Sequence, residues 1–487
     1  MGVAMIWVAV AASLASSWAV LSALSWFVWT PRAITSAFRA QGVGGPDYRF
    51  LVGNIVEMKR LLVESAGLVL DAGCHDYGAL VQPHFRKWMA LYGRTFVSWP
   101  GERPELFMGD VDMVKHVLSD RSGLFPKNPI NDQFACLLGK GLILIDGDEW
   151  KRHRKVVHPV FNVDKLKMLA VTVSDCVGSM LSDWEAKLEK STGHVEVDIS
   201  CQFEEVAADV ISHVAFGRNH KEAKQVYLAQ KELQFLAFSS LFNILNLILG
   251  FRYLPTKNNI KMHTLNKEVR SILVNIIKNR LNCKDTMGYG NDMLGIILNA
   301  CAPEHVQNPL MSMEEIIEEC KTFYLASHET TAQLLTWTMF LLSTNSEWQE
   351  KLREEAIRPR HQHPKKAGSN IDLEIRVPEG TILSTPIKTI HSDKELWGED
   401  AEEFKPQRFE NGVSRAAKHP YAFLPFSMGP RACIGQNFTM IEAKVVLVMI
   451  LQRFSVSLSP KYVHAPMDVF TIRPRYGLQV VLKSLHV

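Results

Sequence analysis

A ten-residue segment in the C-terminal part of the chain combines residue types that could hold a metal ion. Residues 426–435 have the sequence FSMGPRACIG. Cys433 is a candidate metal ligand, because a thiolate binds metals and the free N–H groups of the helix predicted to follow it favour the thiolate over the thiol. Gly429 and Gly435 allow tight turns and close approach of the backbone to a flat ligand. Arg431 could bind a carboxylate, since its planar fork suits that group.

The spacing within this segment resembles a known haem-binding signature. Five residues match every fixed position of the pattern F-x-x-G-x-R-x-C-x-G, which is typical of the cytochrome P450 family: Phe426, Gly429, Arg431, Cys433 and Gly435. The resemblance implies that Cys433 is the axial ligand of a haem iron, where a thiolate favours splitting of an O–O bond. It also implies that the other four residues contact the haem, with Arg431 at a propionate. The alternative is a buried free cysteine in an ordinary turn.

A second motif could bind the same carboxylates. Trp150 and Arg154 are four residues apart in a predicted helix, so they share one face and place an indole N–H beside a guanidinium group. The pair resembles the W-x-x-x-R element that holds haem propionates in the P450 family, and an ordinary basic helix face is the alternative. Lys151, Arg152 and Lys155 are predicted to face outward, either as a basic patch for an acidic electron-donor protein or as a merely solvated face.

A long helix is predicted over residues 313–342. Ser312 and Glu315 form a capping box at its start, and apolar residues continue beyond its centre. At 1.5 Å per residue the helix would span about 45 Å, the width of a domain. Its centre carries the sequence ASHETT at 326–331. A carboxylate beside a hydroxyl is unfavourable in an apolar helix unless it serves a purpose.

This central acid–alcohol pair resembles the P450 element that manages protons during dioxygen activation. The resemblance implies that Glu329 is the acid and Thr330 the hydroxyl of the catalytic pair. A structural salt bridge is the alternative for Glu329. Ser327 stands where the family prefers glycine, which predicts altered oxygen access. His328 is predicted to line the core or a channel rather than to bind a metal.

One part of the family pattern is absent from its expected place. Residues 404–409, FKPQRF, resemble the P-E-R-F element, in which Arg408 belongs to a buried Glu–Arg–Arg network that braces the cysteine loop. The other two members belong to a helix that carries E-x-x-R. Glu355 and Arg358 have this spacing, but Pro359 follows at once and ends any helix.

The length of the chain in this region favours an internal deletion. Thr330 and Cys433 are 103 residues apart, well short of the separation usual in the family. The sequence therefore predicts loss, near 358–366, of the bracing helix and of the substrate-contacting loop after it. The alternative is that the Glu–Arg pair just described serves as a substitute. With the helix lost, Arg408 would be buried without its partner carboxylate, at a cost on the order of 3–5 kcal/mol.

The N-terminal part predicts a membrane anchor. The first 31 residues carry no charged side chain, and an apolar run over 3–29 corresponds to about 40 Å of helix, enough to cross a bilayer core. Trp26 and Trp29 lie where an interfacial aromatic belt would fall, with Arg32 following on the same side. A cleaved signal peptide is the alternative, but the run is too long and lacks a positive n-region. We expect a single-pass anchor in the endoplasmic reticulum membrane, with the rest of the chain in the cytosol.

Composition agrees with one large folded domain behind this anchor. A hydrophobic fraction of 47% in 487 residues allows a substantial core, and a net charge of +3 gives no support to nucleic-acid binding. Eight cysteines without C-x-x-C pairs argue against a zinc site and a disulfide framework, and suit a reducing compartment. The pattern predicts a mainly α fold with small β-sheets (α+β), as in the P450 family, with strands near 95–107, near 371–390 and at the C-terminal end. The expected organisation is an anchor over 1–31, a linker over 32–60 with a flexible stretch at 41–46, and a catalytic domain over 61–487.

Two further stretches indicate a branch of the family. VAADVISHVAFG at 206–217 and YGNDMLG at 289–295 resemble the plant clan of cytokinin hydroxylase-like, secologanin synthase-like and gibberellin-oxidising enzymes. The resemblance implies a haem-dependent monooxygenase that hydroxylates an apolar small molecule (a terpenoid, a hormone or a fatty acid). It would use O2 and electrons from NADPH-cytochrome P450 reductase. The second hypothesis is a truncated family member that binds haem weakly or not at all.

Overall fold

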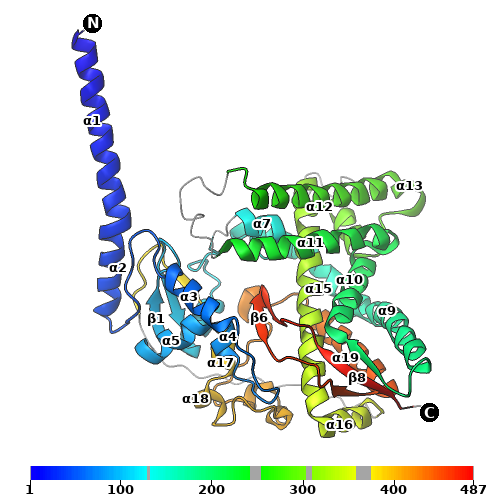
Figure 1. The fold of residues 1–487 in the computed structure, drawn as a ribbon. Coiled ribbons are helices and arrows are strands. Elements are labelled where there is room, and N and C mark those ends of the chain that lie inside the picture. The colour runs from blue at the N-terminus through cyan, green and yellow to red at the C-terminus, as the bar shows by residue number, and fades with distance from the viewer. Residues whose placement is uncertain (1, 129–131, 242–253, 303–309, 358–374, 486–487) are drawn as a thin grey trace.

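The computed structural model of the chain describes residues 2–128, 132–241, 254–302, 310–357 and 375–485. As predicted, the fold is mainly helical with small sheets. Figure 1 shows one long N-terminal helix that projects from a broad body in which helices surround the sheets. The predicted deletion near 358–366 and Arg358 of the E-x-x-R pair lie outside the described residues.

The helices account for most of the body. The α-helices are α1 (Gly2–Leu24), α2 (Thr30–Arg39), α3 (Ile55–Ser65), α4 (Gly78–Val81), α5 (Pro83–Tyr92), α6 (Val111–Leu118), α7 (Asp132–Leu138), α8 (Gly147–Val157), α9 (Val163–Glu189), α10 (Ile199–Phe216), α11 (His220–Leu241), α12 (Lys257–Asn282), α13 (Lys284–Met287), α14 (Met293–Ala300), α15 (Met313–Thr344), α16 (Ser346–Ile357), α17 (Ile387–His391), α18 (Lys394–Trp397) and α19 (Gln436–Arg453). A π-helical turn, η1 (Ser25–Trp29), joins α1 to α2. The 3-10 turns are η2 (His158–Phe161), η3 (Gly217–Asn219), η6 (Pro406–Phe409), η7 (Val413–Arg415) and η8 (Gly429–Arg431).

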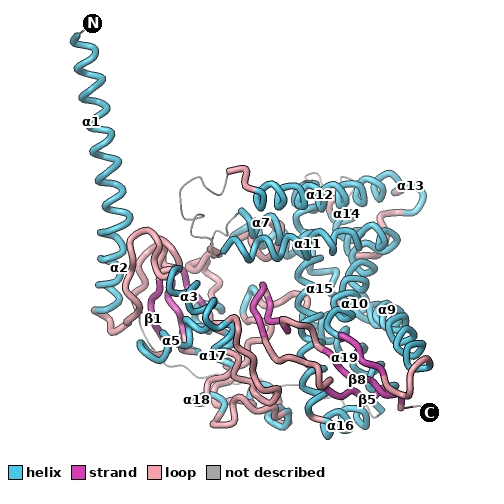
Figure 2. Tube along the Cα trace, viewed as in Figure 1, coloured by secondary structure: helices cyan, strands magenta, loops and turns pink. Residues whose placement is uncertain are grey.

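The strands form three small sheets, drawn in magenta in Figure 2. The strands are β1 (Thr95–Ser98), β2 (Glu105–Met108), β3 (Val195–Asp198), β4 (Ile382–Ser384), β5 (Phe454–Leu458), β6 (Pro466–Val469), β7 (Thr471–Pro474) and β8 (Gln479–Ser484). In the first sheet β2 pairs with β1 antiparallel and with β4 parallel. In the second sheet β8 lies between β3 and β5, and both pairings are antiparallel. Strands β6 and β7 form a separate antiparallel hairpin.

The N-terminal helix is continuous from α1 through η1 into α2. Within the described residues, Met5–Arg39 is long and apolar enough to cross a membrane, with a mean hydropathy of 1.7 and no part of its most apolar stretch buried. The end of this helix and the residues after it pack against the body. Phe38 is 1% and Val43 is 6% exposed, and both belong to the core around β1 and β2. The residues predicted as a linker therefore include core side chains.

Helix α15 runs through the largest core of the described residues and packs against α10, β5 and α19. Its start confirms the predicted capping box, since the Ser312 backbone N–H donates to the Glu315 carboxylate at 2.6 Å and the Glu315 N–H donates to the Ser312 hydroxyl at 3.3 Å. Large side chains that are fully buried fill the space around it: Trp184, Phe203, Phe216, Tyr324 and Phe340. Figure 1 shows α15 passing through the body beside α10 and α19.

The two stretches that indicated the plant branch meet at a buried guanidinium group. Arg280 on α12 is 1% exposed and donates to the Asp292 carboxylate at 2.7 Å and to the Phe216 carbonyl at 2.8 Å. Gly217 has φ +50°, and a Cβ there would lie 2.4 Å from Asp292 Oδ2. The Arg280 guanidinium group therefore contacts both stretches and links α12 to the end of α10 and the start of α14.

A buried carboxyl group on α19 predicts a dependence of stability on pH. Burial raises the pKa of Glu442 to about 8, so the folded chain keeps a proton that the unfolded chain releases above pH ~4.3. Stability should therefore fall as the pH rises from about 4 to about 8. Glu442→Gln should remove this fall and raise the free energy of unfolding at pH 8 by on the order of 2–4 kcal/mol. Urea unfolding of the full chain in detergent at pH 5 and pH 8 measures both values.

The control for this measurement is Glu189→Gln at an exposed position on α9. It should leave the free energy of unfolding within about 0.5 kcal/mol of the parent chain at both pH values. If Glu442→Gln and Glu189→Gln changed the free energy of unfolding equally at both pH values, the buried Glu442 carboxyl group would not be the cause of the pH dependence.

Candidate active site

The predicted metal-binding loop, residues 426–435, contains η8 and leads directly into α19. Its ends are joined by a hydrogen bond in which the Cys433 N–H donates to the Phe426 carbonyl at 2.9 Å. Gly429 has φ +72°, and a Cβ there would lie 2.0 Å from the Leu118 carbonyl oxygen. No other residue type fits at this turn. At Gly435 a Cβ would lie 3.9 Å from Cys433 Sγ, an ordinary contact distance.

The surroundings of Cys433 do not by themselves produce a thiolate. Although the residue is exposed, burial by the surrounding protein raises the pKa of its thiol and outweighs the backbone N–H groups of Gly435 and Gln436 and the charge of Arg154. The N–H groups at the start of the helix do favour the thiolate, as predicted, but in the chain by itself burial raises the pKa of the thiol by more than they lower it. A metal ion deprotonates a coordinating thiol outright, so the thiolate depends on the metal.

Two guanidinium groups lie over one indole ring next to this loop. The central carbon of Arg431 is 4.7 Å, and that of Arg154 is 5.8 Å, from the centre of the Trp150 ring. Both terminal nitrogens of Arg154 donate to the carbonyl of Ala432, at 3.3 and 3.2 Å. Helix α8 thus contacts the residue directly before Cys433.

This cluster is short of negative charge. Arg431 donates to the Asp146 carboxylate and, at 2.9 Å, to the Ile145 carbonyl, but its Nη1 is buried with no hydrogen-bond partner among the described residues. Burial lowers the pKa of Arg154, and the neighbouring charge of Arg431 lowers it further. A dianionic ligand would satisfy both groups. The donor set of one cysteine, two guanidinium groups and an indole therefore fits a haem with its two propionates.

A buried histidine holds α8 against α15. His153 Nδ1 is 2.6 Å from Glu319 Oε1, and both side chains are fully buried. Arg152 on the same helix is only partly exposed, at 37% of its side chain. It is also not a free surface charge, because it donates to the Glu315 carboxylate and to the Leu310 carbonyl. Lys151 and Lys155 are exposed, as predicted.

The centre of α15 is exposed on one side only. Thr330 is exposed and Leu334 is 39% exposed, whereas the residues beside them in sequence are buried. The Thr330 hydroxyl donates to the Ala326 carbonyl at 2.7 Å, one turn earlier in the same helix. Ser327 is partly buried on this side. The small and hydroxylated residues of the predicted oxygen-handling element therefore share an accessible face.

Glu329 faces a different environment from that of Thr330. It is 2% exposed, and its Oε1 accepts hydrogen bonds from Arg473, at 2.5 Å, and from the Thr471 hydroxyl on β7. Burial alone would raise the pKa of Glu329, but Arg473 and Thr471 outweigh burial and hold it below its ordinary value. This geometry corresponds to the salt-bridge alternative, with the carboxylate ionised at neutral pH. His328 lies in the core, as predicted, with its Nδ1 2.6 Å from the Tyr324 carbonyl.

The ion pair continues as a chain of alternating charges to the surface. Arg473 Nη1 lies 3.5 Å from Glu204 Oε1, and Lys231 Nζ donates to Glu204 Oε2 at 2.6 Å. The Lys231 side chain is 39% exposed. Sequence reasoning missed these three residues, because Arg473 lies 144 residues from Glu329 and no local pattern marks such a pairing.

The predicted loss of a partner for Arg408 was wrong. Its side chain is 13% exposed, and its Nη2 lies 2.8 Å from Asp400 Oδ1. It also donates to the carbonyls of Trp397, at 2.9 Å, and Asp400. Asp400 is eight residues away in the same surface segment. The Arg408 guanidinium group thus has a local carboxylate partner. The cost of about 3–5 kcal/mol expected for an unpaired buried charge therefore does not arise.

Comparison with known proteins decides the family. The sequence profile of cytochrome P450 matches residues 74–371 and 370–480 of the chain. The chain belongs to the cytochrome P450 family. Family membership supports a monooxygenase and implies haem as the cofactor, in agreement with the fit of the Cys433 loop.

The curated relatives are plant cytochromes P450. Cytochrome P450 709B1 of Arabidopsis thaliana is 41% identical over an alignment of 495 positions that covers 94% of each chain. Secologanin synthase 1 of Catharanthus roseus is 35% identical, with 95% of this chain and 94% of the relative covered. Cytochrome P450 734A6 of Oryza sativa is also 35% identical. These relatives confirm the predicted plant branch of the family.

A solved structure confirms the P450 fold. Retinoic acid-bound cyanobacterial CYP120A1 matches with a TM-score of 0.68 and 22% sequence identity, over 83% of this chain and 94% of that one.

The Arg408–Asp400 contact predicts a local brace for the segment before the cysteine loop. Asp400→Asn should make the segment between α18 and η7 more susceptible to proteolysis, because it weakens the charged partner of Arg408. Glu399→Gln is the matched control, since the Glu399 side chain is 93% exposed and 3.7 Å from Lys394. Limited proteolysis with mass spectrometry compares the two, and equal cleavage rates would contradict the brace.

The Glu329–Arg473 pair predicts stability that depends on pH. Glu329→Gln should lower the free energy of unfolding at pH 7 by about 3 kcal/mol, the cost of breaking one side of a buried pair. The folded-state pKa of Glu329 is depressed, so its contribution is present above pH ~4.3 and is lost as the pH falls through the folded pKa. The difference between variant and parent should therefore shrink in acid, as measured by urea unfolding. Glu314→Gln, at an exposed ion pair on the same helix, should cost less than about 1 kcal/mol.

Proposed function

We propose that this chain is a membrane-anchored haem monooxygenase that hydroxylates an apolar small molecule. It would use O2 and electrons from NADPH-cytochrome P450 reductase. The observation that carries the proposal is the position of Arg154 and Arg431 beside the Cys433 loop, with one guanidinium nitrogen buried and unpaired among the described residues.

The proposed haem site assigns one role to each predicted residue. Cys433 would ligate the iron, and Trp150, Arg154 and Arg431 would hold the propionates. The remaining contacts to the ring would come from Phe426, Gly429 and Gly435. When bound, the haem supplies the dioxygen chemistry that inserts oxygen into a C–H bond.

Glu329 and Thr330 are proposed as the catalytic acid and alcohol. Thr330 would hold a proton at the exposed face of α15, where its hydroxyl can exchange its bond to the Ala326 carbonyl for one to a ligand. Glu329 is ionised in its pair with Arg473, which would keep its charge and hold the carboxylate in place. As the proposed acid, Glu329 would take up a proton from water and return it through water toward Thr330, since no direct contact joins the two side chains. The apolar core around α15 would exclude other water.

The proposed substrate is a terpenoid, a plant hormone or a fatty acid. The plant relatives, among them secologanin synthase 1 of Catharanthus roseus, support a small plant metabolite as the substrate and do not distinguish these three classes. The loop of residues that would contact the substrate after the bracing helix belongs to the proposed deletion, so the pocket wall would differ from that of a full-length relative.

The proposed organisation places the chain at the endoplasmic reticulum membrane. Residues 1–31 would be a single-pass anchor, 32–60 would connect it, and 61–487 would form the catalytic domain in the cytosol. The exposed apolar surface of α1 supports this arrangement. Trp26 and Trp29 are also exposed, at 55% and 53%, as side chains of an interfacial belt are.

A second candidate function is a truncated family member with impaired haem binding. Two observations favour it. The family profile matches in two segments that meet at residue 370. The alignment with the Arabidopsis relative is longer than this chain although it covers 94% of it, so the relative has residues that this chain lacks. Both observations support an internal deletion near 358–366 that removes the E-x-x-R helix.

A carbon monoxide difference spectrum of the reduced full chain separates the two functions. The absorption band of thiolate-ligated haem is expected, and Cys433→Ser should abolish it while leaving the circular dichroism of the helices unchanged. Arg154→Gln should reduce the haem content about tenfold, because one charge-assisted contact to a propionate contributes roughly 1.5–3 kcal/mol. Apoprotein alone, or the band of a neutral-ligand haem, would contradict the monooxygenase and support the truncated member. Insertion of the corresponding segment of the Arabidopsis relative near residue 370 should then restore the band.

A further inference from the structure

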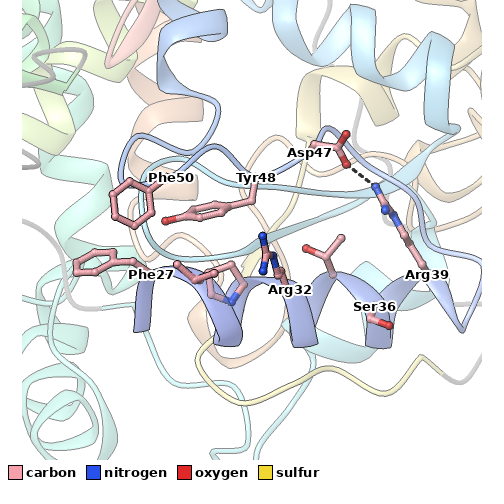
Figure 3. A pocket seen from close by; sticks show the side chains of 10 residues that line it. Phe27, Arg32, Ser36, Arg39, Asp47, Tyr48 and Phe50 are labelled. Atoms are coloured by element: carbon pink, nitrogen blue, oxygen red, sulfur yellow. Dashed lines mark hydrogen bonds and ion pairs between the residues drawn. The ribbon is translucent and has the colours of Figure 1, made fainter. Parts of the chain in front are cut away.

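The junction between the N-terminal helix and the body contains a pocket that the haem site does not use. Its volume is about 480 Å³. Figure 3 shows η1 and α2 along one side and the segment 47–50 along the other. We call it the junction pocket, and its lining residues are Phe27, Val28, Pro31, Arg32, Thr35, Ser36, Arg39, Asp47, Tyr48 and Phe50.

One end of the junction pocket carries a free positive charge and a free hydroxyl. Arg39 is neutralised by Asp47, with 2.6 Å between the guanidinium and carboxylate atoms. Arg32 points from α2 toward the opposite segment in Figure 3 and makes no hydrogen bond or ion pair with any described residue. The Thr35 hydroxyl oxygen is buried and also lacks a partner within the described chain. A buried hydroxyl without a partner is unfavourable, and both groups would be satisfied by one anion.

The other end of the pocket is aromatic. The rings of Phe27 and Phe50 lie edge to face with their centres 6.1 Å apart, and Phe50 is 59% exposed. Tyr48 is held in place, because its ring packs on Trp99 at 5.0 Å and its hydroxyl accepts from the Leu51 N–H at 3.1 Å. This end would favour an apolar chain, which a simple inorganic anion does not have.

The location of the pocket points to the membrane as the source of its ligand. Its first lining residue, Phe27, lies three residues after Leu24, where the exposed apolar helix α1 ends. If α1 spans the bilayer, as in the proposed function on which this inference rests, residues 27–32 lie at the level of the lipid headgroups. Phosphate groups and the upper parts of acyl chains are concentrated at that level.

We propose that the junction pocket binds one membrane glycerophospholipid. Arg32 and the Thr35 hydroxyl donate hydrogen bonds to its phosphate, and the start of one acyl chain lies along Phe27 and Phe50. A single unneutralised arginine matches the single charge of a phosphodiester. A volume of about 480 Å³ holds a headgroup and the first part of a chain, while the rest of the lipid stays in the bilayer.

Native mass spectrometry of the full chain, released from phosphatidylcholine nanodiscs, tests the site. We expect one retained phosphatidylcholine per chain. Arg32→Gln should lower the retained fraction about tenfold, because a charge-assisted hydrogen bond is lost. Thr35→Val, which keeps the shape of the side chain, should lower it about fivefold.

Arg49→Gln is the matched control, since Arg49 is exposed beside the pocket but does not line it. It should leave the retained fraction unchanged. Equal losses in Arg32→Gln and Arg49→Gln would overturn the site in favour of general surface electrostatics. Retention that is unchanged in both pocket variants would overturn it too.

Vesicle flotation separates this inference from the anchoring on which it rests. A parent chain that floats with phosphatidylcholine vesicles but retains no lipid would overturn the lipid site and leave the anchor intact. A chain that does not float would overturn both. All variants should float equally with the parent, because α1 is unchanged in them.

Discussion

The close placement of two partly buried guanidinium groups is the constraint on which the candidate active site depends. Arg154 and Arg431 share the Trp150 ring, and burial, with a further contribution from the charge of Arg431, lowers the pKa of Arg154. The fold nevertheless holds them there, because α8 is tied to α15 by the buried His153–Glu319 contact. The two guanidinium groups therefore stay close together, but their positive charge is not fully balanced by the described residues. An anionic ligand beside Cys433 would balance it.

Local features of this chain could be predicted, and long-range pairings could not. The start of α15 follows from a capping box four residues long, and the shared face of Trp150 and Arg154 follows from the helical repeat. The partner of Glu329 comes from a hairpin 144 residues away. Burial patterns do not reveal such a partner, because any buried carboxylate needs one and the sequence does not say which.

Two smaller errors have the same origin. The sequence predicts that Arg152 faces outward, as part of a basic patch or of a solvated face, but helix periodicity cannot show that Glu315 approaches it from α15. Residues 32–60 were expected to connect rather than to pack, yet Phe38 and Val43 belong to the core around β1 and β2. Small apolar clusters under a connecting segment leave little periodic signal. In both cases the environment of the residue depends on a part of the chain that is distant in sequence.

The local partner of Arg408 changes what the proposed deletion would do. With Asp400 at 2.8 Å, the segment before the cysteine loop has its own charge compensation. The missing helix would then affect how firmly the loop is held against the core and how the substrate is enclosed, rather than leave a charge buried alone. Ligand binding and substrate enclosure therefore become separable properties of this chain.

The second sheet has a consequence for the order in which the body can fold. Strand β8 lies between β3 and β5, and the Leu478 N–H donates to the Asp198 carboxylate, 280 residues earlier, at 3.1 Å. Strand β3 therefore has no strand partner in this sheet until β8, the last strand of the chain, has been synthesised. Such late closure of a long loop slows folding. For this chain the helices α9 to α15 are therefore complete in sequence long before the second sheet can close.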